Sequence, residues 1–333
     1  MAFTACGDDD DDATNADVPA ALADSADGMQ IVDGLIRIDV GVIPMAPACT
    51  IFLGVEKGFF KEEGLAPIIQ SQFSGGTVGI PAVMAGQQHF TFGSWGPVTQ
   101  AAAEGLPVIG VMPNDSAGPR PDDNYSVLVA SGRSGVKSMK ELAGKTVALN
   151  TLKQLSEIQT RATMEAQDVD PSSVKFVALP YPEMGAAMRQ GRIDAALLAE
   201  PFLSQAEADR TLGIVRLSAT QHYLSPNLNE TMWTTSRKLY EENPNLVARF
   251  QRAIAKSADY CQSNEQEVRD FIPRFTDVDP EIAGKLQLST WEIREFDPKQ
   301  VQHIADMAAK YGIIDEKVDM TDYIGQVPPP GAS

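Results

Sequence analysis

The sequence predicts an α/β protein of two lobes with a ligand cleft between them, and three observations support this. Short apolar strands alternate with helices over residues 35–112, which is typical of βα units on a largely parallel sheet. The loop "PNDSAGPRPDDN", dense in Pro, Gly, Asp and Asn, then separates this series from a second one that extends to residue 219. The chain beyond residue 230 is mainly helical.

The first series opens with "LIRIDVGVI", in which apolar residues at 36, 38, 40 and 42 alternate with others and predict a strand. A helix is expected over "CTIFLGVEKGFF", with Gly58 near its end. Further strands are expected in "APIIQSQF", "QHFTFGS" and "LPVIGVM", and further helices in "TVGIPAVMAG" and "GPVTQAAAEG".

The second series begins with the strand "YSVLVAS" and continues with "GKTVALN", "VKFVALP", "RIDAALLA" and "GIVRLSA". Helices are expected between these strands, near residues 152–167, 183–190 and 202–209. The segment "SMKE", from Ser138 to Glu141, predicts a capping box in which the Ser caps the helix start and the Glu reaches back. The turn-rich patch "HYLSPNLNE" closes this half near residue 230.

Two helices dominate the C-terminal part. The first begins with Asn243 as N-cap and Pro244 at the first helical position, and the second repeats this start with Asp297 and Pro298 and ends at Gly312. The inward stripe of the first helix is expected to consist of Leu246, Phe250, Ile254, Ala258 and Cys261.

These helices are expected to return to the first lobe, so that the chain crosses between lobes near residues 123–127 and 226–233. The expected units are an acidic tether (1–34), a discontinuous first lobe (35–125 and 231–320), a second lobe (126–230) and a flexible tail (321–333). Two crossings leave a cleft above a hinge, which is an architecture for closing around a small molecule.

Composition excludes several classes of function. The net charge of −18 argues against binding nucleic acid, which requires clustered Lys and Arg. The three His and three Cys show no pairing typical of a zinc site, so no metal or cofactor is expected. No apolar run approaches the ~20 residues that span a bilayer.

Several motifs resemble the nitrate/sulfonate/taurine family of ABC-importer solute-binding proteins. These are "GVEKGFFKEEGL", "SGG" before a helix, "MAGQQHFTFGS", "AAAEGLPV", "SMKELAGKTVAL" and "MRQGRIDAALLAEPF", in the family's order and spacing over residues 35–320. The resemblance implies a type II periplasmic-binding fold without catalysis. It also implies a monomer that captures a small molecule and delivers it to an ABC permease with its ATPase.

An enzyme on the same fold, similar to a pyrimidine synthase or a chorismate lyase, is the alternative, because fold alone does not settle function. The synthase would need a His donor and a metal-binding Cys cluster, and neither is visible in the sequence. A transcription regulator would need a helix-turn-helix segment or a basic patch.

The stretch "FTACGDDDDD" resembles the end of a lipobox followed by a solvated spacer. In the context of this family, Cys6 is expected to receive lipid after a signal peptide is removed. That would anchor the protein to the outer face of the cell membrane. An ordinary acidic N-terminal tail with an incidental cysteine is the other interpretation.

Five segments are expected to line the cleft, because ligands of this fold bind at strand C-termini and helix N-termini. The candidate binding residues are Pro47, Ala48, Ser74, Gly75, Gly76, Thr77, Ser94, Trp95, Thr151, Gln154, Ser156, Glu200 and Phe202, with Tyr181 and Trp233 near the lobe junctions. Trp95 stands between Ser94 and a glycine at a strand end, which favours a stacking platform; a Trp packed under a loop is the alternative.

The polar candidates also have structural alternatives. Ser74 to Thr77 and Thr151 to Ser156 are equally typical of turns and helix caps. Glu200 follows a strand and precedes a Pro-started helix, so it points into the cleft, complements the helix dipole, or does both.

The balance of these residues favours a neutral or heteroaromatic ligand over a small inorganic anion, with an organosulfonate as the other class. The five segments contain no arginine, the side chain that best binds anions through two parallel hydrogen bonds. Cys49 is placed at the cleft rim and Cys261 in the core, and a disulfide between them is left open.

Overall fold

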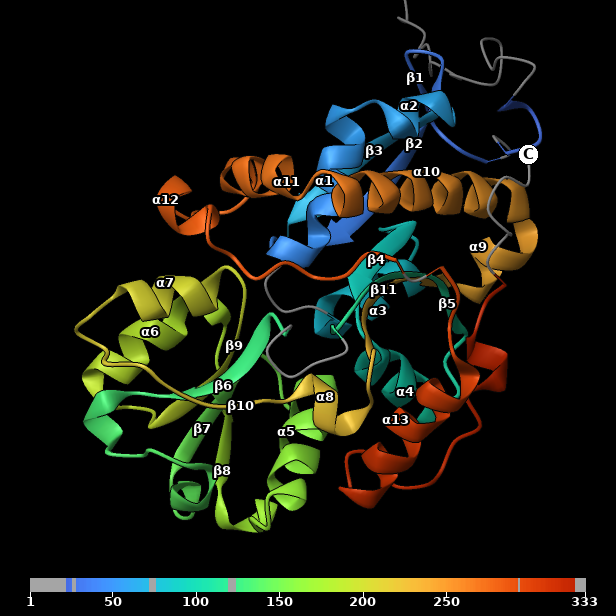
Figure 1. The fold of residues 1–333 in the computed structure, drawn as a ribbon. Helices are drawn as coiled ribbons and strands as arrows, with labels where there is room; N and C mark the ends of the chain where they lie inside the picture. The colour runs from blue at the N-terminus through green and yellow to red at the C-terminus, as the bar shows by residue number, and fades with distance from the viewer. Residues whose placement is uncertain (1–21, 26–27, 72–75, 119–123, 293, 327–333) are drawn as a thin grey trace, which may run out of the picture.

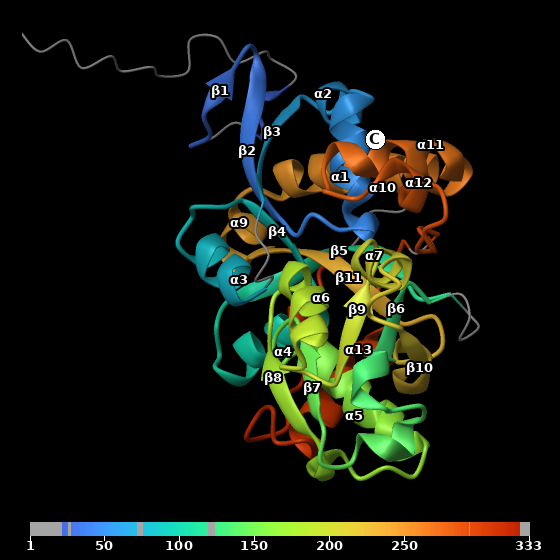
Figure 2. The ribbon, with the colours of Figure 1, turned by 90° about the vertical axis from the view of Figure 1, so that its left-hand side faces the viewer.

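The computed structural model describes residues 22–25, 28–71, 76–118, 124–292 and 294–326. Its strands form two separate sheets, each with its own covering helices, which confirms the predicted α/β class (Figure 1). Both views place β4, β5 and β11 of the first sheet nearest to the second lobe (Figure 1, Figure 2).

The first sheet has the order β1-β2-β4-β11-β5, with β3 also paired to β2. Its strands are β1 (Ile31–Val32), β2 (Leu35–Val42), β3 (Leu65–Ser71), β4 (Phe90–Gly93), β5 (Val108–Ser116) and β11 (Asn229–Ser236). β2 is parallel to β3 and β4, whereas β11 is antiparallel to β4 and β5.

The second sheet has the order β10-β6-β9-β7-β8. Its strands are β6 (Ser126–Ala130), β7 (Thr146–Leu149), β8 (Lys175–Ala178), β9 (Ala195–Ala199) and β10 (Val215–Ala219). β7 is parallel to β8 and β9, whereas β6 is antiparallel to β9 and β10.

The prediction of largely parallel sheets was therefore wrong at β6 and β11. These are the first strands after the chain has crossed from the other lobe. A strand that enters its sheet from the cleft end runs opposite to strands that finish there. β5 is also longer than predicted, because Pro113 to Ser116, interpreted as loop, continue it.

The helices are α1 (Cys49–Glu56), α2 (Phe59–Glu62), α3 (Gly76–Met84), α4 (Trp95–Ala103), α5 (Leu155–Ala166), α6 (Tyr181–Gln190), α7 (Phe202–Ala208), α8 (Gln221–Leu224), α9 (Arg237–Glu242), α10 (Pro244–Ser263), α11 (Glu265–Phe271), α12 (Pro280–Ala283) and α13 (Pro298–Lys310). None of those in the described part of the chain is long and apolar enough to cross a membrane. Helices lie on both sides of the first sheet, with α1 and α10 on one side and α4 and α13 on the other (Figure 1).

Two local predictions need correction. The single helix expected from Cys49 is divided into α1 and α2 at Gly58, whose φ of 79° ordinary side chains rarely adopt. In the expected capping box, Glu141 does reach back and accepts a hydrogen bond from the Lys137 amide at 2.6 Å. Ser138, however, makes no side-chain capping bond to the short 3-10 helix that follows.

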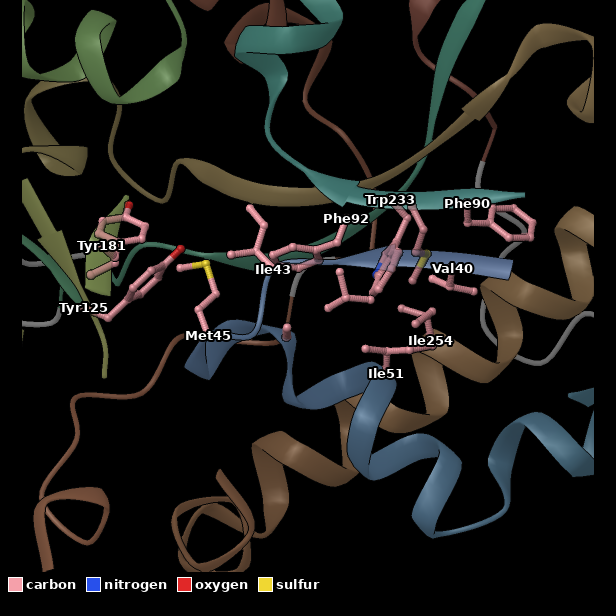
Figure 3. Packing of buried hydrophobic residues seen from close by; sticks show 14 of the residues in the cluster. Val40, Ile43, Met45, Ile51, Phe90, Phe92, Tyr125, Tyr181, Trp233 and Ile254 are labelled. Carbon is pink, nitrogen blue, oxygen red and sulfur yellow. The ribbon is translucent and has the colours of Figure 1, made fainter. Parts of the chain in front are cut away.

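The core of the first lobe forms where α10 crosses the sheet. Phe90 stacks on Phe250 with ring centroids 3.8 Å apart, and Trp233 packs edge-on against Phe250 at 5.3 Å. The other members of the predicted α10 stripe, Leu246, Ile254, Ala258 and Cys261, are also buried. Figure 3 shows this row of apolar side chains continuing through Phe92 and Ile43 to two tyrosines, Tyr125 and Tyr181.

Cys49 and Cys261 meet inside this lobe, where α1 packs on α10. Both are buried free thiols, and their Sγ atoms lie 2.9 Å apart. Burial raises the pKa of the Cys49 thiol well above its ordinary value. Cys49 therefore lies in the core and not at the cleft rim.

Parts of both terminal segments pack on the first lobe. Leu22 is buried in the core, Arg249 Nε donates a hydrogen bond to Ser25 Oγ at 2.9 Å, and β1 pairs with β2. At the other end, the Gly325 amide donates a hydrogen bond to the Gly110 carbonyl at 2.7 Å. The tether prediction is thus wrong for the described residues from 22 to 34, and the tail prediction for 321–326. Residues 1–21, with Cys6 and the aspartate run, and 327–333 lie outside the described residues.

Candidate functional site

A cavity of about 60 Å³ lies between the lobes. It is lined by Ile43, Met45, Phe92, Gly93, Ser94, Tyr125, Asn150, Thr151, Gln154, Leu155, Ser156, Gln159, Tyr181, Ala199, Glu230 and Thr231. These residues lie just after β2, at the ends of β4, β7 and β9, at the starts of α5 and α6, and where β6 and β11 begin. Both lobes therefore contribute to the wall, at the edges where this architecture binds ligands.

Five of the predicted binding residues line this cavity: Ser94, Thr151, Gln154, Ser156 and Tyr181. Around the start of α5, Thr151 Oγ1 donates a hydrogen bond to Gln154 Oε1 at 3.1 Å, and Ser156 Oγ donates one to the Thr151 carbonyl at 3.2 Å. These local bonds give the wall a defined shape. The role of the five residues in ligand binding stays a prediction.

Trp95 does not form a stacking platform in the cavity. Its side chain is 0% exposed, its Nε1 donates a hydrogen bond to Asn229 Oδ1 at 3.1 Å, and its ring packs edge-on against Phe296. The glycine that follows Trp95 has a different role: a Cβ at Gly96 would lie 2.3 Å from the Leu155 backbone nitrogen. The glycine lets α4 approach α5 of the other lobe; it does not expose the tryptophan.

Trp233 is likewise a core residue. It lies in the middle of β11, is 0% exposed, and its Nε1 donates a hydrogen bond to Asn114 Oδ1 at 3.3 Å. The position along β11 decides this placement, because Trp233 lies two residues farther from the cavity end of the strand than Thr231. Thr231 on the same strand lines the cavity, whereas Trp233 packs against Phe92 and Phe250.

Glu200 caps α7 and is not among the residues that line the cavity. Its carboxylate accepts hydrogen bonds from the Ser204 amide at 3.1 Å and from the Ser204 hydroxyl at 2.8 Å. The side chain is 1% exposed, and burial raises the pKa of this carboxyl to about 7. Glu200 was expected either to point into the cleft or to complement the dipole of the following helix, and its contacts are those of a residue at a helix N-terminus.

The other candidates lie behind the wall or outside the described residues. Phe202 stacks on Tyr181 with ring centroids 5.3 Å apart, so it supports a lining residue from behind. Pro47 and Ala48 are buried in a 3-10 helix, and the Pro47 carbonyl accepts a hydrogen bond from Asn114 Nδ2. Ser74 and Gly75 are outside the described residues, and Gly76 and Thr77 open α3, so their part in binding stays a prediction.

Sequence reasoning missed the polar group at the floor of the cavity: Tyr125, Gln159, Glu230 and, behind them, Asp115. Tyr125 and Glu230 lie at the two lobe crossings, and Asp115 lies in the part of β5 that was interpreted as loop. A carboxylate beside each crossing was the available signal. These carboxylates were not recognised as buried, because Asp and Glu in stretches rich in turn-forming residues such as Pro and Asn are usually solvated.

Glu230 is the acidic side chain among the described residues that line the cavity. Its Oε1 accepts a hydrogen bond from Gln159 Nε2 at 3.3 Å, and its Oε2 is buried without a hydrogen-bond partner. Burial first, and then the charge of Asp115, raise the pKa of this carboxyl to about 8. Burial also raises the pKa of Asp115, which accepts hydrogen bonds from the amide and the hydroxyl of Thr231.

These buried acids predict a pH-dependent stability. A carboxyl whose pKa is raised on folding from 4.5 binds its proton more tightly in the folded state. The stability it contributes is therefore complete below pH 4.5 and is lost as the pH rises through about 7 for Glu200 and about 8 for Glu230. Each group contributes a slope of at most about 1.4 kcal/mol per pH unit.

Urea unfolding at about pH 5, 6.5 and 8 measures how the free energy of unfolding changes with pH. Wild type is expected to lose stability across the series relative to Glu230→Gln, which has no proton to lose at that position. Parallel curves for the two proteins would contradict the prediction.

No group of three or more His, Cys, Asp or Glu within the described residues is arranged to hold a metal ion. The residues that line the cavity include no Lys, Arg or His among those the structure describes. The site is therefore a small polar and aromatic cavity with an acidic floor.

Among solved structures, the fold is similar to that of the alkanesulfonate-binding protein SsuA from Xanthomonas axonopodis pv. citri bound to MOPS. The TM-score is 0.72 at 13% identity, over 86% of this chain and 97% of that chain. It is also similar to the periplasmic aliphatic sulphonate binding protein SsuA from Escherichia coli, with a TM-score of 0.71 at 14% identity over 89% and 94%. The periplasmic nitrate-binding protein NrtA from Synechocystis PCC 6803 matches with a TM-score of 0.69 at 13% identity over 84% and 82%. These likenesses show a periplasmic-binding-protein fold.

A curated relative from Bacillus subtilis (strain 168), named "Putative aliphatic sulfonates-binding protein", is 22% identical over 201 residues. The chain spans 59% of the length of that relative. The family model described as NMT1/THI5 like matches residues 48–268, which is about two thirds of the chain and includes most of the cavity wall. The chain therefore belongs to the NMT1/THI5-like family.

Proposed function

We propose that this protein is the solute-binding component of an ABC importer and is not an enzyme. The observation that carries the proposal is the polar cavity between the lobes, whose wall is built by both of them. A molecule held there touches both lobes at once, so its binding energy favours the closed arrangement of the lobes. A permease with its ATPase would then recognise the closed form.

Two ligand classes are supported by different observations. The names of the relatives support an organosulfonate, since SsuA proteins and the Bacillus subtilis relative are described as sulfonate-binding. The cavity wall supports a heteroaromatic molecule, because Phe92, Tyr125 and Tyr181 line it and aromatic rings favour stacking or edge contacts.

A ligand screen combined with scattering tests this function. Sulfonates, nitrate, pyrimidines, flavins and aromatic acids are screened by thermal shift, and each hit is followed by small-angle scattering. We expect at least one class to raise the melting temperature, compact the protein and be recovered chemically unchanged. A solute that is recovered as a different compound would instead support the enzyme on the same fold.

We also propose that the protein acts outside the cell membrane, as a monomer anchored through lipid on Cys6. The support is the lipobox-like "FTAC" in the sequence and the fold shared with periplasmic binding proteins. A single acyl chain binds a membrane only marginally, so the two or more chains of a bacterial lipoprotein would be needed for a stable anchor.

The anchor predicts that Cys6→Ser moves the protein from the membrane fraction to the soluble fraction when it is expressed behind its native signal. Immunoblots of the separated fractions measure this distribution. Cys261→Ser, which changes a buried thiol far from the N-terminus in sequence, is the control and is expected to stay with the membrane. Equal membrane association of Cys6→Ser and wild type would contradict the anchor.

A further inference from the structure

The floor of the cavity offers two acceptor oxygens that make no hydrogen bond of ordinary length within the described residues, although the side chain of Gln221 lies near enough to Glu230 to lower its pKa. Glu230 Oε2 and Gln159 Oε1 are both buried without a hydrogen-bond partner, and both residues line the cavity. Gln159 already commits its amide nitrogen, because Nε2 donates to Glu230 Oε1 at 3.3 Å. The pair therefore presents one carboxylate oxygen and one amide oxygen as acceptors, and one of the two N–H groups of Gln159 is already used in the bond between them.

A second carboxylate adds negative charge behind this pair. Asp115 is 0% exposed, and its Oδ2 makes no hydrogen bond of ordinary length, although the hydroxyls of Ser289 and Tyr125 lie near enough to lower its pKa. It is connected to the wall through Thr231, whose amide donates to Asp115 Oδ1 at 3.1 Å. The basic Arg161 on α5 does not compensate, because it pairs with Glu157 and packs on the ring of Phe176.

Such an arrangement is costly in a cavity without a ligand. A buried polar group without a partner destabilises a protein by about 1–3 kcal/mol, and a charged one by more. Native structures leave few such groups, and each one calls for an explanation. A ligand that supplies donors and positive charge would satisfy Glu230 Oε2 and Gln159 Oε1 and would also offset the charge of Asp115 behind them.

We infer that the ligand is a small organic cation carrying N–H donors, of the guanidinium or amidinium type, which donates to Glu230 Oε2 and Gln159 Oε1. This inference rests on the proposed solute-binding function and names the ligand class. The rings of Phe92, Tyr125 and Tyr181 in the same wall suit a delocalised planar cation, which is attracted to aromatic faces. Figure 3 shows Tyr125 and Tyr181 beside each other at the cavity end of the buried row.

A sulfonate fits this floor poorly. Its oxygens are acceptors, as are Glu230 Oε2 and Gln159 Oε1, and the described lining has no Arg or Lys to pair with it. Above the pKa of Glu230, which is about 8, an anion would also meet the negative charge of that carboxylate. The ligand class named for the relatives is therefore not the one that this floor favours.

The same geometry makes cation binding depend on pH. The groups that face Glu230 are Asp115 and Gln159, with Gln221 on α8 and the two tyrosines nearby. Burial and Asp115 raise the pKa of Glu230 to about 8, so most of it is protonated at pH 6. A cation that binds the ionised form is therefore expected to bind about tenfold or more tightly at pH 8 than at pH 6.

Calorimetry with methylguanidinium and methanesulfonate, each at pH 6 and pH 8, tests the inference. Methylguanidinium keeps its charge over this range, so a pH dependence belongs to the protein. Wild type is expected to bind it at pH 8 and to release protons on binding. Glu230→Gln is expected to weaken binding by about tenfold or more and to abolish the pH dependence. Glu200→Gln, which changes a buried carboxyl outside the cavity wall, is the matched control and is expected to bind like wild type.

Three results would overturn the inference: no binding of methylguanidinium, unchanged binding by Glu230→Gln, or tighter binding of methanesulfonate than of methylguanidinium by wild type. Methanesulfonate that binds and compacts the protein in scattering would overturn the cation while leaving the solute-binding function in place. Failure of every solute in the wider screen to bind would instead count against the proposed function itself.

Discussion

Trp95→Ala is expected to lower the free energy of unfolding by about 3–5 kcal/mol. The indole is fully buried between α4 and the C-terminal part of the chain, where it packs against Phe296. Removing it leaves a cavity and also strands Asn229 Oδ1, which accepts the hydrogen bond of the indole nitrogen. From its position in the sequence, at a strand end between small residues, Trp95 was instead expected to stack on a ligand, and its removal would then leave the stability of the fold nearly unchanged.

Urea denaturation followed by circular dichroism measures the effect of this substitution. Trp95→Phe keeps most of the buried area and loses the hydrogen bond, so it is expected to cost less, about 1–2 kcal/mol. Tyr223→Ala is the matched aromatic control, because Tyr223 is 41% exposed and its loss is expected to change stability by about 0.5 kcal/mol or less. A Trp95→Ala midpoint equal to that of Tyr223→Ala would show that the indole is not a core residue.

Gly96→Val is expected to hold the two lobes apart and to weaken ligand binding by about tenfold or more. Gly96 lies in the first turn of α4, and a Cβ there would lie 2.3 Å from the backbone nitrogen of Leu155 on α5. Backbone cannot move aside as a flexible side chain does, so α4 and α5 must separate. Since these helices belong to different lobes, their separation opens the cavity between them.

Small-angle scattering and calorimetry with the best hit of the screen measure this effect. Gly96→Val is expected to have a larger radius of gyration than wild type and to compact less when ligand is added. Gly185→Ala is the control, because the nearest atom to its added Cβ is a Leu212 methyl group at 3.9 Å. Wild-type affinity in Gly96→Val would mean that the lobes close without the α4–α5 contact.

The order of strands and helices was predictable from the sequence because it is encoded locally. Alternation at residues 36 to 42, the stripe from Leu246 to Cys261, and the Asn243-Pro244 start each involve residues that are neighbours in the chain. Local signals also marked where the chain crosses between the two sheets, since polar and Pro-rich stretches separate the two series of βα units. The direction of β6 and β11 was not predictable in this way, because it depends on the end from which each strand enters its sheet.

The membership of the cavity depended on the tertiary structure. Asp115, Gln159 and Glu230 are far apart in sequence, and they meet only because β5, α5 and β11 converge at the lobe junction. A sequence cannot show that an acceptor atom lacks a hydrogen-bond partner, because this depends on which groups surround the atom in the folded protein.

The sequence by itself was thus enough to predict two α/β lobes, to show a family resemblance, and to name five of the residues that line the cavity. Only the tertiary structure decided that Trp95 and Trp233 stabilise the core, that Glu200 caps a helix, and that Glu230 faces the cavity. The physical reason is that periodicity is set by neighbours along the chain, whereas the side to which a strand-end residue points is set by what the opposite lobe packs against it.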